Sequence, residues 1–251
     1  MEHGICPCGT QGPDRPRRNM DLIAWNGPGN RLLAGLPSAD FDLISPHLVK
    51  ASFPRGAVLA ETGNDTDLIY FPLDGMITLL SVTQDGKAIE TATIGRDGVF
   101  GAMAVFGPYR SRVRAIVQVP MTAVHISAPQ LRAVADASKA ISLLCVHYNE
   151  TLLGQARITA ACNALHPIEE RLCRWLLRTC EVIETNTIHL TQEFLSEMLG
   201  VRRSSITEAA IRLQAAGLIS YSRGVINILD ISGIQQRACG CFQTLRDQRD
   251  L

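Results

Sequence analysis

The sequence predicts an α+β chain with an all-β domain first, one long helix after it, and a winged helix-turn-helix at the end. Three observations predict this order. Short apolar runs separated by glycine-rich turns fill residues 51–127, and apolar residues then recur at helical spacing over residues 138–164. After residue 188 come a helix, a glycine turn, a second helix and two short strands. A chain of 251 residues has room for two small domains.

The first 49 residues precede the strand pattern. Residues 1–29 contain four prolines, several glycines and a basic run, which is typical of a disordered tail. Met20 is a second candidate for the start of translation. Residues 30–49 predict a helical lead-in, with Ser38 as an N-cap.

A β-domain is predicted over residues 30–137, lead-in included. Asp85-Gly86 between two apolar runs is a strong hairpin signal, whereas the glycine- and alanine-rich segment 98–106 interrupts the strand pattern. The expected strands are Ala57–Ala60, Leu68–Phe71, Met76–Val82, Ala88–Ile94 and Val113–Ile126.

A long helix is predicted over residues 138–165, because apolar residues recur at three- and four-residue steps and no proline interrupts them. At 1.5 Å per residue such a helix is about 40 Å long. Its apolar stripe needs a partner. The simplest partner is the same helix of a second copy in a homodimer, and the alternative is the chain's own β-domain.

The winged helix-turn-helix is predicted within residues 166–240, and residues 241–251 are expected to form a second tail. Thr191 can cap a helix that ends at Gly200, a residue suited to a left-handed C-cap. A second helix is expected over residues 204–216, followed by strands at 218–221 and 225–229.

The second helix and the strands carry a local excess of arginine, which suits bidentate contacts with guanine or phosphate. In this motif the residues that open the second helix face the major groove of double-stranded DNA. The candidates for base edges are Arg203, Ser204, Thr207 and Glu208. The candidates for phosphates are Thr191, Arg202, Ser205 and Arg223, and Arg212 adds to the basic face.

Several motifs resemble the Crp–Fnr superfamily of bacterial transcription regulators. They are Pro54-Arg55-Gly56-x-Val58-Leu59-x-Glu61-x-Gly63, then Leu68-Ile69-Tyr70-Phe71-x-Leu73-Asp74-Gly75, and then Gly98-x-Phe100-Gly101. The resemblance covers about residues 30 to 230. It implies a β-roll of the cyclic-nucleotide-binding type (a double-stranded β-helix or jelly roll), a dimerisation helix, a palindromic DNA site and contact with RNA polymerase.

The effector of such a regulator is left open. The family's cyclic-AMP pocket uses a Gly-Glu-Leu segment and a downstream Arg-Ser pair, and here the first segment is Gly101-Ala102-Met103. Alanine cannot accept the ribose hydrogen bond, so cyclic AMP is not expected. A different acidic small molecule and no effector at all remain open. The candidate effector residues are Phe100, Gly101, Ala102, Met103, Arg110, Ser111 and Arg112.

The cysteine pattern does not predict a metal site. Cys145, Cys162, Cys173 and Cys180 fall in helical segments, where cysteine is most often a small buried hydrophobe. The pairs Cys6/Cys8 and Cys239/Cys241 could supply four thiolates, but ligand pairs usually have two or more intervening residues. We therefore assign no metal ligand and no cofactor.

Composition and motifs narrow the remaining function classes. Lys+Arg and Asp+Glu number 24 each, so the formal net charge of +0 argues against a globally basic nucleic-acid coat but not against a local patch. Neither a membrane-spanning run nor a secretory signal is visible, so we expect a cytoplasmic protein with no membrane partner. No catalytic constellation is recognisable, so an enzyme is not expected. The rival hypothesis is a β-roll interaction module that does not bind DNA.

Overall fold

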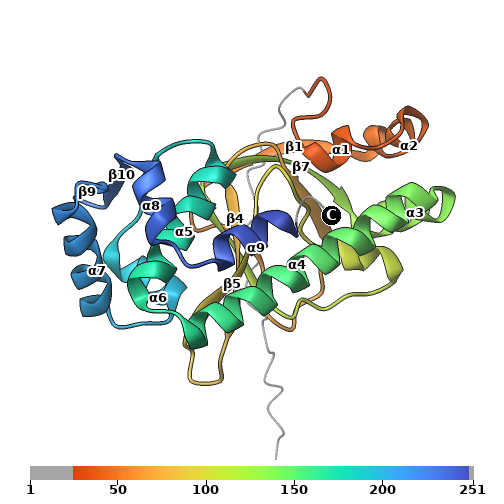
Figure 1. The fold of residues 1–251 in the computed structure, drawn as a ribbon. Helices are drawn as coiled ribbons and strands as arrows, with labels where there is room; N and C mark the ends of the chain where they lie inside the picture. The colour runs from red at the N-terminus through yellow and green to blue at the C-terminus, as the bar shows by residue number, and fades with distance from the viewer. Residues whose placement is uncertain (1–24, 249–251) are drawn as a thin grey trace, which may run out of the picture.

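The computed structural model describes residues 25–248. Figure 1 shows the long helix α4 (Lys139–Leu165) crossing the molecule, with the strands of the first domain behind it and the helices of the second domain at the left. The order of elements agrees with the predicted β-domain, long helix and winged helix-turn-helix. The predicted fold class is therefore confirmed.

Two antiparallel sheets form the first domain. One sheet has the strand order β1-β7-β3, with β1 (Val49–Phe53), β7 (Met121–Ser127) and β3 (Leu68–Pro72). The other has the order β2-β6-β4-β5, with β2 (Val58–Ala60), β6 (Arg114–Val119), β4 (Met76–Val82) and β5 (Ala88–Ile94). Apolar side chains of both sheets share one buried core, as expected when each strand turns alternate residues inward.

The strand predictions hold best where a turn signal is strong. Asp85-Gly86 joins β4 to β5, the Thr83 N–H donates to Lys87 O, and Gly86 has a φ of 82° that favours glycine. The single run expected over 113–126 is instead two strands, because Pro120 interrupts the ladder. Strand β1 begins at Val49, inside the expected helical lead-in.

The lead-in contains α1 (Arg31–Ala34), α2 (Ser38–Ile44) and the 3₁₀ helix η1 (Ser45–His47). Asn30 caps α1, and its amide also donates to Pro72 O and Gly98 O, each at 2.9 Å. Trp25 packs edge-on against Phe41, with 6.0 Å between ring centroids. Part of the predicted 1–29 tail is therefore packed on the β-domain, and residues 1–24 of that prediction lie outside the described residues.

Two helices connect the sheets to the second domain, α3 (Ala128–Ala137) and α4, whereas the 3₁₀ helix η2 (Ala102–Phe106) lies between β5 and β6. Ser138 caps α4 by accepting the Ile141 N–H at 3.1 Å. One side of α4 packs on the β-domain through Ile141, Cys145 and Tyr148. The alternative partner of the apolar stripe is thus present in the same chain.

The second domain begins with α5 (Ile168–Ile183). A sheet of order β8-β10-β9 follows, made of β8 (Thr187–His189), β9 (Ile219–Ser222) and β10 (Val225–Ile228). Between β8 and β9 lie α6 (Gln192–Leu199) and α7 (Arg203–Ala215), and α8 (Ile231–Arg237) follows β10. The sequence predicted α6, α7, β9 and β10 within a residue or two but missed the short β8.

The segment expected as a tail from residue 241 contains helix α9 (Cys241–Asp247). Phe242 and Leu245 of α9 are buried, and the helix packs against α4 and α5. Burial of these two side chains is the physical reason why the tail prediction is wrong for residues 241–247. Residues 249–251 lie outside the described part of the chain.

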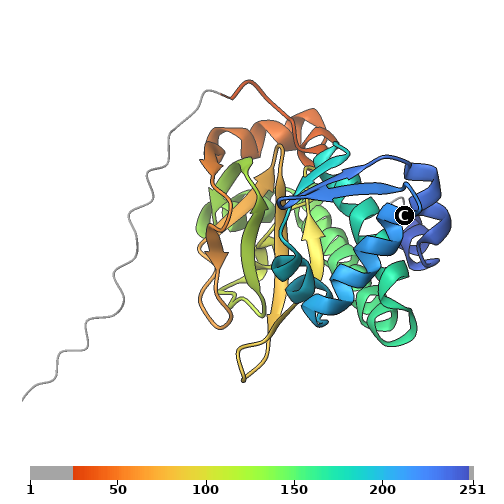
Figure 2. The same cartoon turned by 90° about the vertical axis from the view of Figure 1, so that its left-hand side faces the viewer.

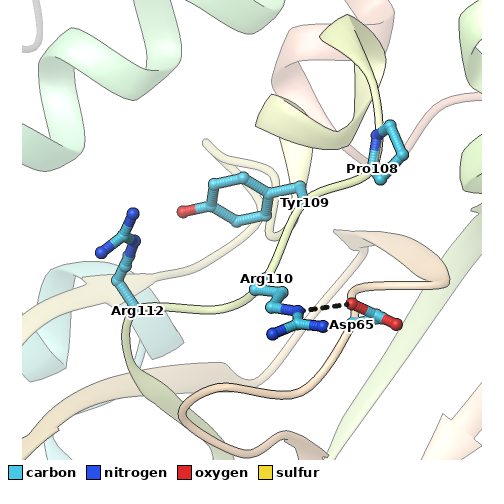
Figure 3. Close-up of a pocket in the computed structure, with 5 residues that line it drawn as sticks. All are labelled: Asp65, Pro108, Tyr109, Arg110 and Arg112. Atoms are coloured by element: carbon cyan, nitrogen blue, oxygen red, sulfur yellow. Dashed lines mark hydrogen bonds and ion pairs between the residues drawn. The ribbon is translucent and has the colours of Figure 1, made fainter.

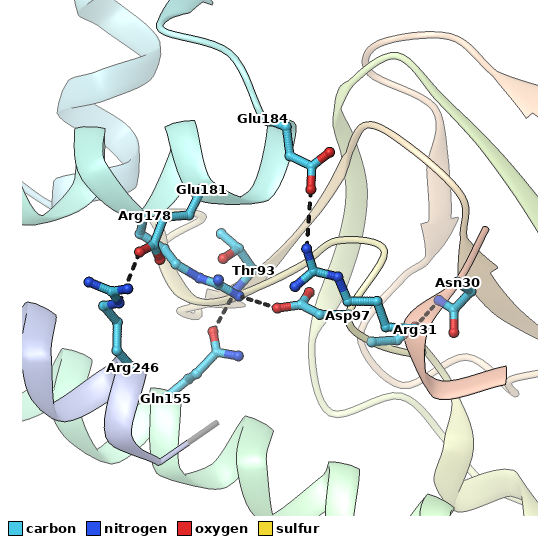
Figure 4. A network of polar contacts seen from close by, with 10 residues as sticks. Asn30, Arg31, Thr93, Asp97, Gln155, Arg178, Glu181, Glu184 and Arg246 are labelled. Carbon is cyan, nitrogen blue, oxygen red and sulfur yellow. Dashed lines mark hydrogen bonds and ion pairs between the residues drawn. The ribbon is translucent and has the colours of Figure 1, made fainter. Parts of the chain in front are cut away.

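Polar contacts join the two domains along α5 (Figure 4). Arg178 Nη2 lies 3.5 Å from Asp97 Oδ2, and Glu184 Oε1 lies 3.2 Å from Arg31 Nη2 and 2.6 Å from Arg96 Nη2. These pairs hold the carboxyl-terminal half of α5 against the first domain. Among residues 25–248, no helix combines the length and apolar character needed to cross a membrane.

Candidate nucleic-acid interface

Helix α7 turns its first residues away from the protein. Gly200 ends α6 in the left-handed conformation, with φ of 62°, and redirects the chain into α7. Ile206 and Leu213 of α7 are fully buried against the rest of the second domain. Because buried residues fix the inner face of a helix, the opening residues of α7 are left outside. Arg202, Arg203 and Ser204 are all exposed there.

A polar contact fixes α7 against α6. Thr207 Oγ1 lies 2.9 Å from Gln192 Oε1 and 3.1 Å from Arg203 O. Thr191 Oγ1 caps α6 by accepting the Phe194 N–H at 3.2 Å. The sequence analysis missed Gln192, whose place at the first turn of α6 was its only signal. Gln192 now joins the candidate interface as a residue that positions Thr207.

The wing lies beside the start of α6. Arg223 occupies the turn between β9 and β10 with φ of 49°, and its side chain is exposed. A Cβ on the next residue, Gly224, would lie 3.8 Å from Thr191 Cγ2. The Tyr221 hydroxyl donates to Leu190 O at 2.9 Å and so attaches the wing to the strand before α6. Thr191, Arg223 and the start of α7 therefore lie at one end of the domain.

The remaining candidates differ in their surroundings. Arg203 Nη1 is 3.9 Å from Glu193 Oε2, a long contact between exposed groups that leaves the guanidinium accessible. Glu208 is exposed and Ser205 is half-buried. Arg212 Nε instead lies 2.6 Å from Glu169 Oε2 on α5.

The Arg212 contact favours a structural role for that residue. Arg237 Nη1 also lies 2.9 Å from the Glu169 carboxylate. Hydrogen bonds first from Arg212 and then from Arg237 hold the pKa of Glu169 below its usual range, although burial opposes them. This charge cluster joins α5, α7 and α8, so the Arg212 side chain, which is 51% exposed, is already engaged with Glu169.

Figure 2 looks onto this side of the molecule and shows the C-terminal segments, in blue, beside the strands of the first domain. The interface combines an accessible helix N-terminus, exposed arginines and a wing that carries another arginine. Such an arrangement can place guanidinium groups against phosphates and base edges at the same time.

The candidate effector residues are only partly brought together. Asp65, Pro108, Tyr109, Arg110 and Arg112 line an open pocket of about 510 Å³ in the first domain. In Figure 3 the Tyr109 ring extends toward Arg112, whereas Arg110 turns to Asp65, with 3.3 Å between Nε and Oδ1. Two cationic side chains thus border the pocket, one of them already paired.

The other predicted effector residues do not line this pocket. Phe100 and Ala102 are buried in the core of the first domain, and Met103 is half-buried. A Cβ on Gly101 would lie 3.0 Å from Thr66 Cγ2, so this segment is packed closely. Ser111 is buried and its hydroxyl donates to Val113 O at 2.6 Å. The predicted set is therefore divided between core and pocket.

Two family models match the chain. A cyclic nucleotide-binding domain matches residues 50–138, which run from β1 to the end of α3. A Crp-like helix-turn-helix domain matches residues 170–237, which run from α5 to α8. The matched segments coincide with the two domains of the structure.

Two bacterial transcriptional regulators align with most of this chain. The CRP-like cAMP-activated global transcriptional regulator of Mycobacterium tuberculosis (strain CDC 1551 / Oshkosh) is 23% identical over 217 residues, covering 82% of this chain and 96% of that protein. The global nitrogen regulator of Synechocystis sp. (strain ATCC 27184 / PCC 6803 / Kazusa) is 23% identical over 199 residues, covering 75% of this chain and 88% of that protein.

A solved structure shares the fold. A protein from Eubacterium rectale, described as a transcriptional regulator of the Crp/Fnr family, superposes with a TM-score of 0.66 at 19% identity. The superposition covers 83% of this chain and 98% of the Eubacterium protein. At this identity the likeness shows the fold alone. The candidate interface residues are inferred from the geometry of α6, α7 and the wing.

Proposed function

Because the chain belongs to the Crp–Fnr superfamily of DNA-binding transcriptional regulators, we propose that it acts as a homodimer on a palindromic duplex site, with one α7 in the major groove of each half-site. The observation that carries this proposal is the exposed start of α7, where two arginines stand beside the wing arginine. Two recognition helices of a symmetric dimer would enter successive grooves about 34 Å apart.

The residue roles follow from position on the interface. Arg203, Ser204 and Glu208 are exposed on α7 and are proposed to reach base edges. Thr207 lies between α6 and α7, where its hydroxyl is already engaged, so it is proposed to contribute less. The proposed phosphate contacts lie at the edge of this surface rather than at its centre; they are Thr191, Arg202, Ser205 and Arg223.

The experiment is a selection of randomised duplex DNA on the purified protein, repeated at two salt concentrations. Enrichment of a two-fold symmetric sequence is the expected result. Arg203→Ala should then weaken binding by about 1–3 kcal/mol and blur one base position in each half-site. Arg246→Ala is the matched control, because Arg246 lies on α9 and pairs with Glu181 rather than facing DNA.

Each outcome of the selection is informative. If Arg203→Ala keeps both affinity and sequence preference, Arg203 does not read DNA. If no duplex is enriched with or without candidate ligands, the rival function applies, in which the β-domain is an interaction module without DNA binding.

We further propose that the pocket lined by Arg110 and Arg112 binds an acidic small molecule other than cyclic AMP. The name of the mycobacterial relative includes activation by cAMP, and this property is stated for that protein and not for this chain. In this chain Ala102 is buried and has no carboxylate for a ribose hydroxyl. A thermal-shift screen of organic phosphates and carboxylates should find a stabilising ligand whose effect is lost in Arg112→Ala. A stabilising ligand that is unaffected by Arg112→Ala would place the effector elsewhere.

The regulator is also proposed to contact RNA polymerase from its DNA site in the cytoplasm, as implied by the family. Transcription in vitro from a selected site should change when the protein is added. The direction of that change would define it as an activator or a repressor, and unchanged transcription would contradict the polymerase contact.

A further inference from the structure

Four metal-ligating side chains meet where the long helix joins the second domain. Cys162 lies near the end of α4, His166 lies in the link to α5, and Cys239 and Cys241 flank the start of α9. Their ligand atoms all lie within 4.8 Å of one another. We propose that Cys162, His166, Cys239 and Cys241 bind one divalent zinc ion in a tetrahedral Cys₃His site.

The interatomic distances suit a single ion. A zinc ion with about 2.3 Å to sulfur and about 2.0–2.1 Å to nitrogen separates two tetrahedral sulfur ligands by about 3.8 Å, and sulfur from nitrogen by about 3.6 Å. Cys162 Sγ and Cys239 Sγ are 3.5 Å apart, and Cys241 Sγ is 3.6 Å from His166 Nδ1. Two edges of the tetrahedron are therefore nearly formed already.

The compactness of the cluster distinguishes zinc from an iron–sulfur centre. In a cluster of several irons the cysteines bind different iron atoms, so their sulfurs stand far apart. Three thiolates and one imidazole on a single centre are instead a common structural zinc set. Because four protein ligands would leave no open position on the zinc for water or substrate, the proposed role of the site is structural.

A buried arginine supplies independent support. Arg174 of α5 is 5% exposed, and its Nε–H donates to Cys162 Sγ at 3.2 Å. A buried guanidinium requires a negative partner, because burying an unpaired charge is costly. Zinc with three thiolates and a neutral imidazole carries one net negative charge. Arg174 would thus both balance the site and donate a hydrogen bond to one of its ligands.

The cluster brings together cysteines that the sequence pattern does not predict to meet. Cys162 is typical of a small buried hydrophobe in a helix, and a single residue separates Cys239 from Cys241. Cys239 and Cys241 would not need a second pair of cysteines, because Cys162 near the end of α4 and His166 just after it would supply the other two ligands. The pair Cys6/Cys8 lies outside the described residues and is not needed to complete the set.

The position of the site gives it a consequence. It would join the end of α4, the α4–α5 link and the α8–α9 segment at one point. Bound zinc would therefore fix the angle at which the second domain leaves the long helix. His166 and Cys241 are half-buried, so an ion has a route in from the surface.

The test begins with the full chain, purified under reducing conditions and stripped by a chelator. Titration with Co²⁺, which reports coordination by its absorption, should saturate at one ion per chain with the intense visible bands of a tetrahedral thiolate site. Added Zn²⁺ should displace the cobalt, and metal analysis should find one zinc per chain. The apo protein should melt at a lower temperature than the zinc form.

Variants identify the ligands. Cys241→Ser and His166→Gln should each weaken cobalt binding by at least about 10-fold and alter the spectrum. Cys180→Ser is the matched control, because Cys180 is a half-buried cysteine of α5 outside the cluster. The double variant Cys6→Ser/Cys8→Ser should bind cobalt as the unmodified chain does.

Three results would overturn the proposal. One is an octahedral or absent cobalt spectrum in the reduced, folded protein, which circular dichroism would verify. Another is loss of binding in the Cys6→Ser/Cys8→Ser variant. The third is a disulfide between Cys162 and Cys239 in freshly purified protein, seen as two missing thiols among the eight and no metal. None of these measurements depends on DNA binding, so they stand apart from the proposed function.

Discussion

Glu90 places a buried carboxyl at the interface between the domains. It lies on β5, yet Trp175 Nε1 of α5 donates to its Oε1 at 2.9 Å, and Thr78 Oγ1 is 3.4 Å from its Oε2. Burial raises the pKa of the Glu90 carboxyl to about 7, and the nearby Arg174 and the hydrogen bond from Trp175 only partly oppose that rise. The carboxyl therefore keeps its proton in the folded protein up to near neutral pH.

The linkage between this pKa and stability has a definite sign. Between about pH 4.5 and 7 the folded state holds the Glu90 proton while the unfolded chain has lost it. Stability from this residue is complete below that window and falls as pH rises through it, by on the order of 3 kcal/mol in total. Glu90→Gln, which keeps an acceptor for Trp175, should match the unmodified protein near pH 4 and be more stable at pH 8.

Urea unfolding at several pH values measures the difference. Glu197→Gln on the exposed face of α6 is the control and should follow the unmodified protein at every pH. If the stability curves of Glu90→Gln and the unmodified protein stay parallel from pH 4 to 8, folding does not raise the pKa of the Glu90 carboxyl.

At the scale of elements, local signals explain what the sequence could predict. Helix α6 was located because Thr191 caps it and Gly200 closes it, and both signals lie within a few residues of the helix. Strands β4 and β5 were located because a two-residue turn separates two long apolar runs. The pocket around Arg110 was only partly foreseen, because motif position does not reveal that Phe100 and Ala102 face the core.

Elements without local signals were missed. Strand β8 has three residues and exists through pairing with β10. Its residue Thr187 pairs with Asn227, which lies 40 residues further along the chain, beyond two helices and a strand. Helix α9 has seven residues and depends on burial of Phe242 and Leu245. The cluster of Cys162, His166, Cys239 and Cys241 was missed for the same reason, because Cys162 and Cys239 are 77 residues apart in the chain. Tertiary contacts decide such features, and periodicity cannot show them.

Helix α9 gives a prediction at this scale. Phe242 is 8% exposed and belongs to the core of the second domain. Phe242→Ala should lower the free energy of unfolding by about 3 kcal/mol, because it removes buried apolar area and leaves a cavity. Gln243→Ala, on the exposed side of the same helix, should change it by less than about 0.5 kcal/mol. Equal small effects in urea unfolding would show that α9 does not belong to the folded core.

The whole molecule depends on how the second domain sits on the first. Arg55, in the turn between β1 and β2, donates to His189 O at 2.8 Å and lies 5.6 Å from the centre of the Phe194 ring. Leu80 of β4 belongs to the core of the second domain, and Gly200 lies against Ile89 of β5. The turn between α6 and α7 therefore touches the β-domain directly. A change in the sheets therefore has a short route to α7, the proposed recognition helix, that does not pass through α4.

The proposed homodimer sets a further requirement, because one α7 could contact only one half of a two-fold site. On the side of α4 that faces away from the β-domain, Leu143, Val146 and Leu153 are each about 40% exposed. They recur at three and seven residues, the spacing of a helix-to-helix seam. Burying these side chains against a second α4 would remove apolar surface from water, which is the driving force expected for the homodimer.

Leu153→Glu tests that seam. It would place two like charges in the apolar interface and should raise the dissociation constant of the dimer at least about 100-fold, with loss of binding to the two-fold site. Sedimentation equilibrium measures the first effect and titration of labelled duplex the second. Leu229→Glu, which changes an exposed leucine just after β10, should leave the dimer intact. A Leu153→Glu protein that remains dimeric would mean that copies associate through another surface, and the spacing of the two recognition helices would then have to be set by that surface.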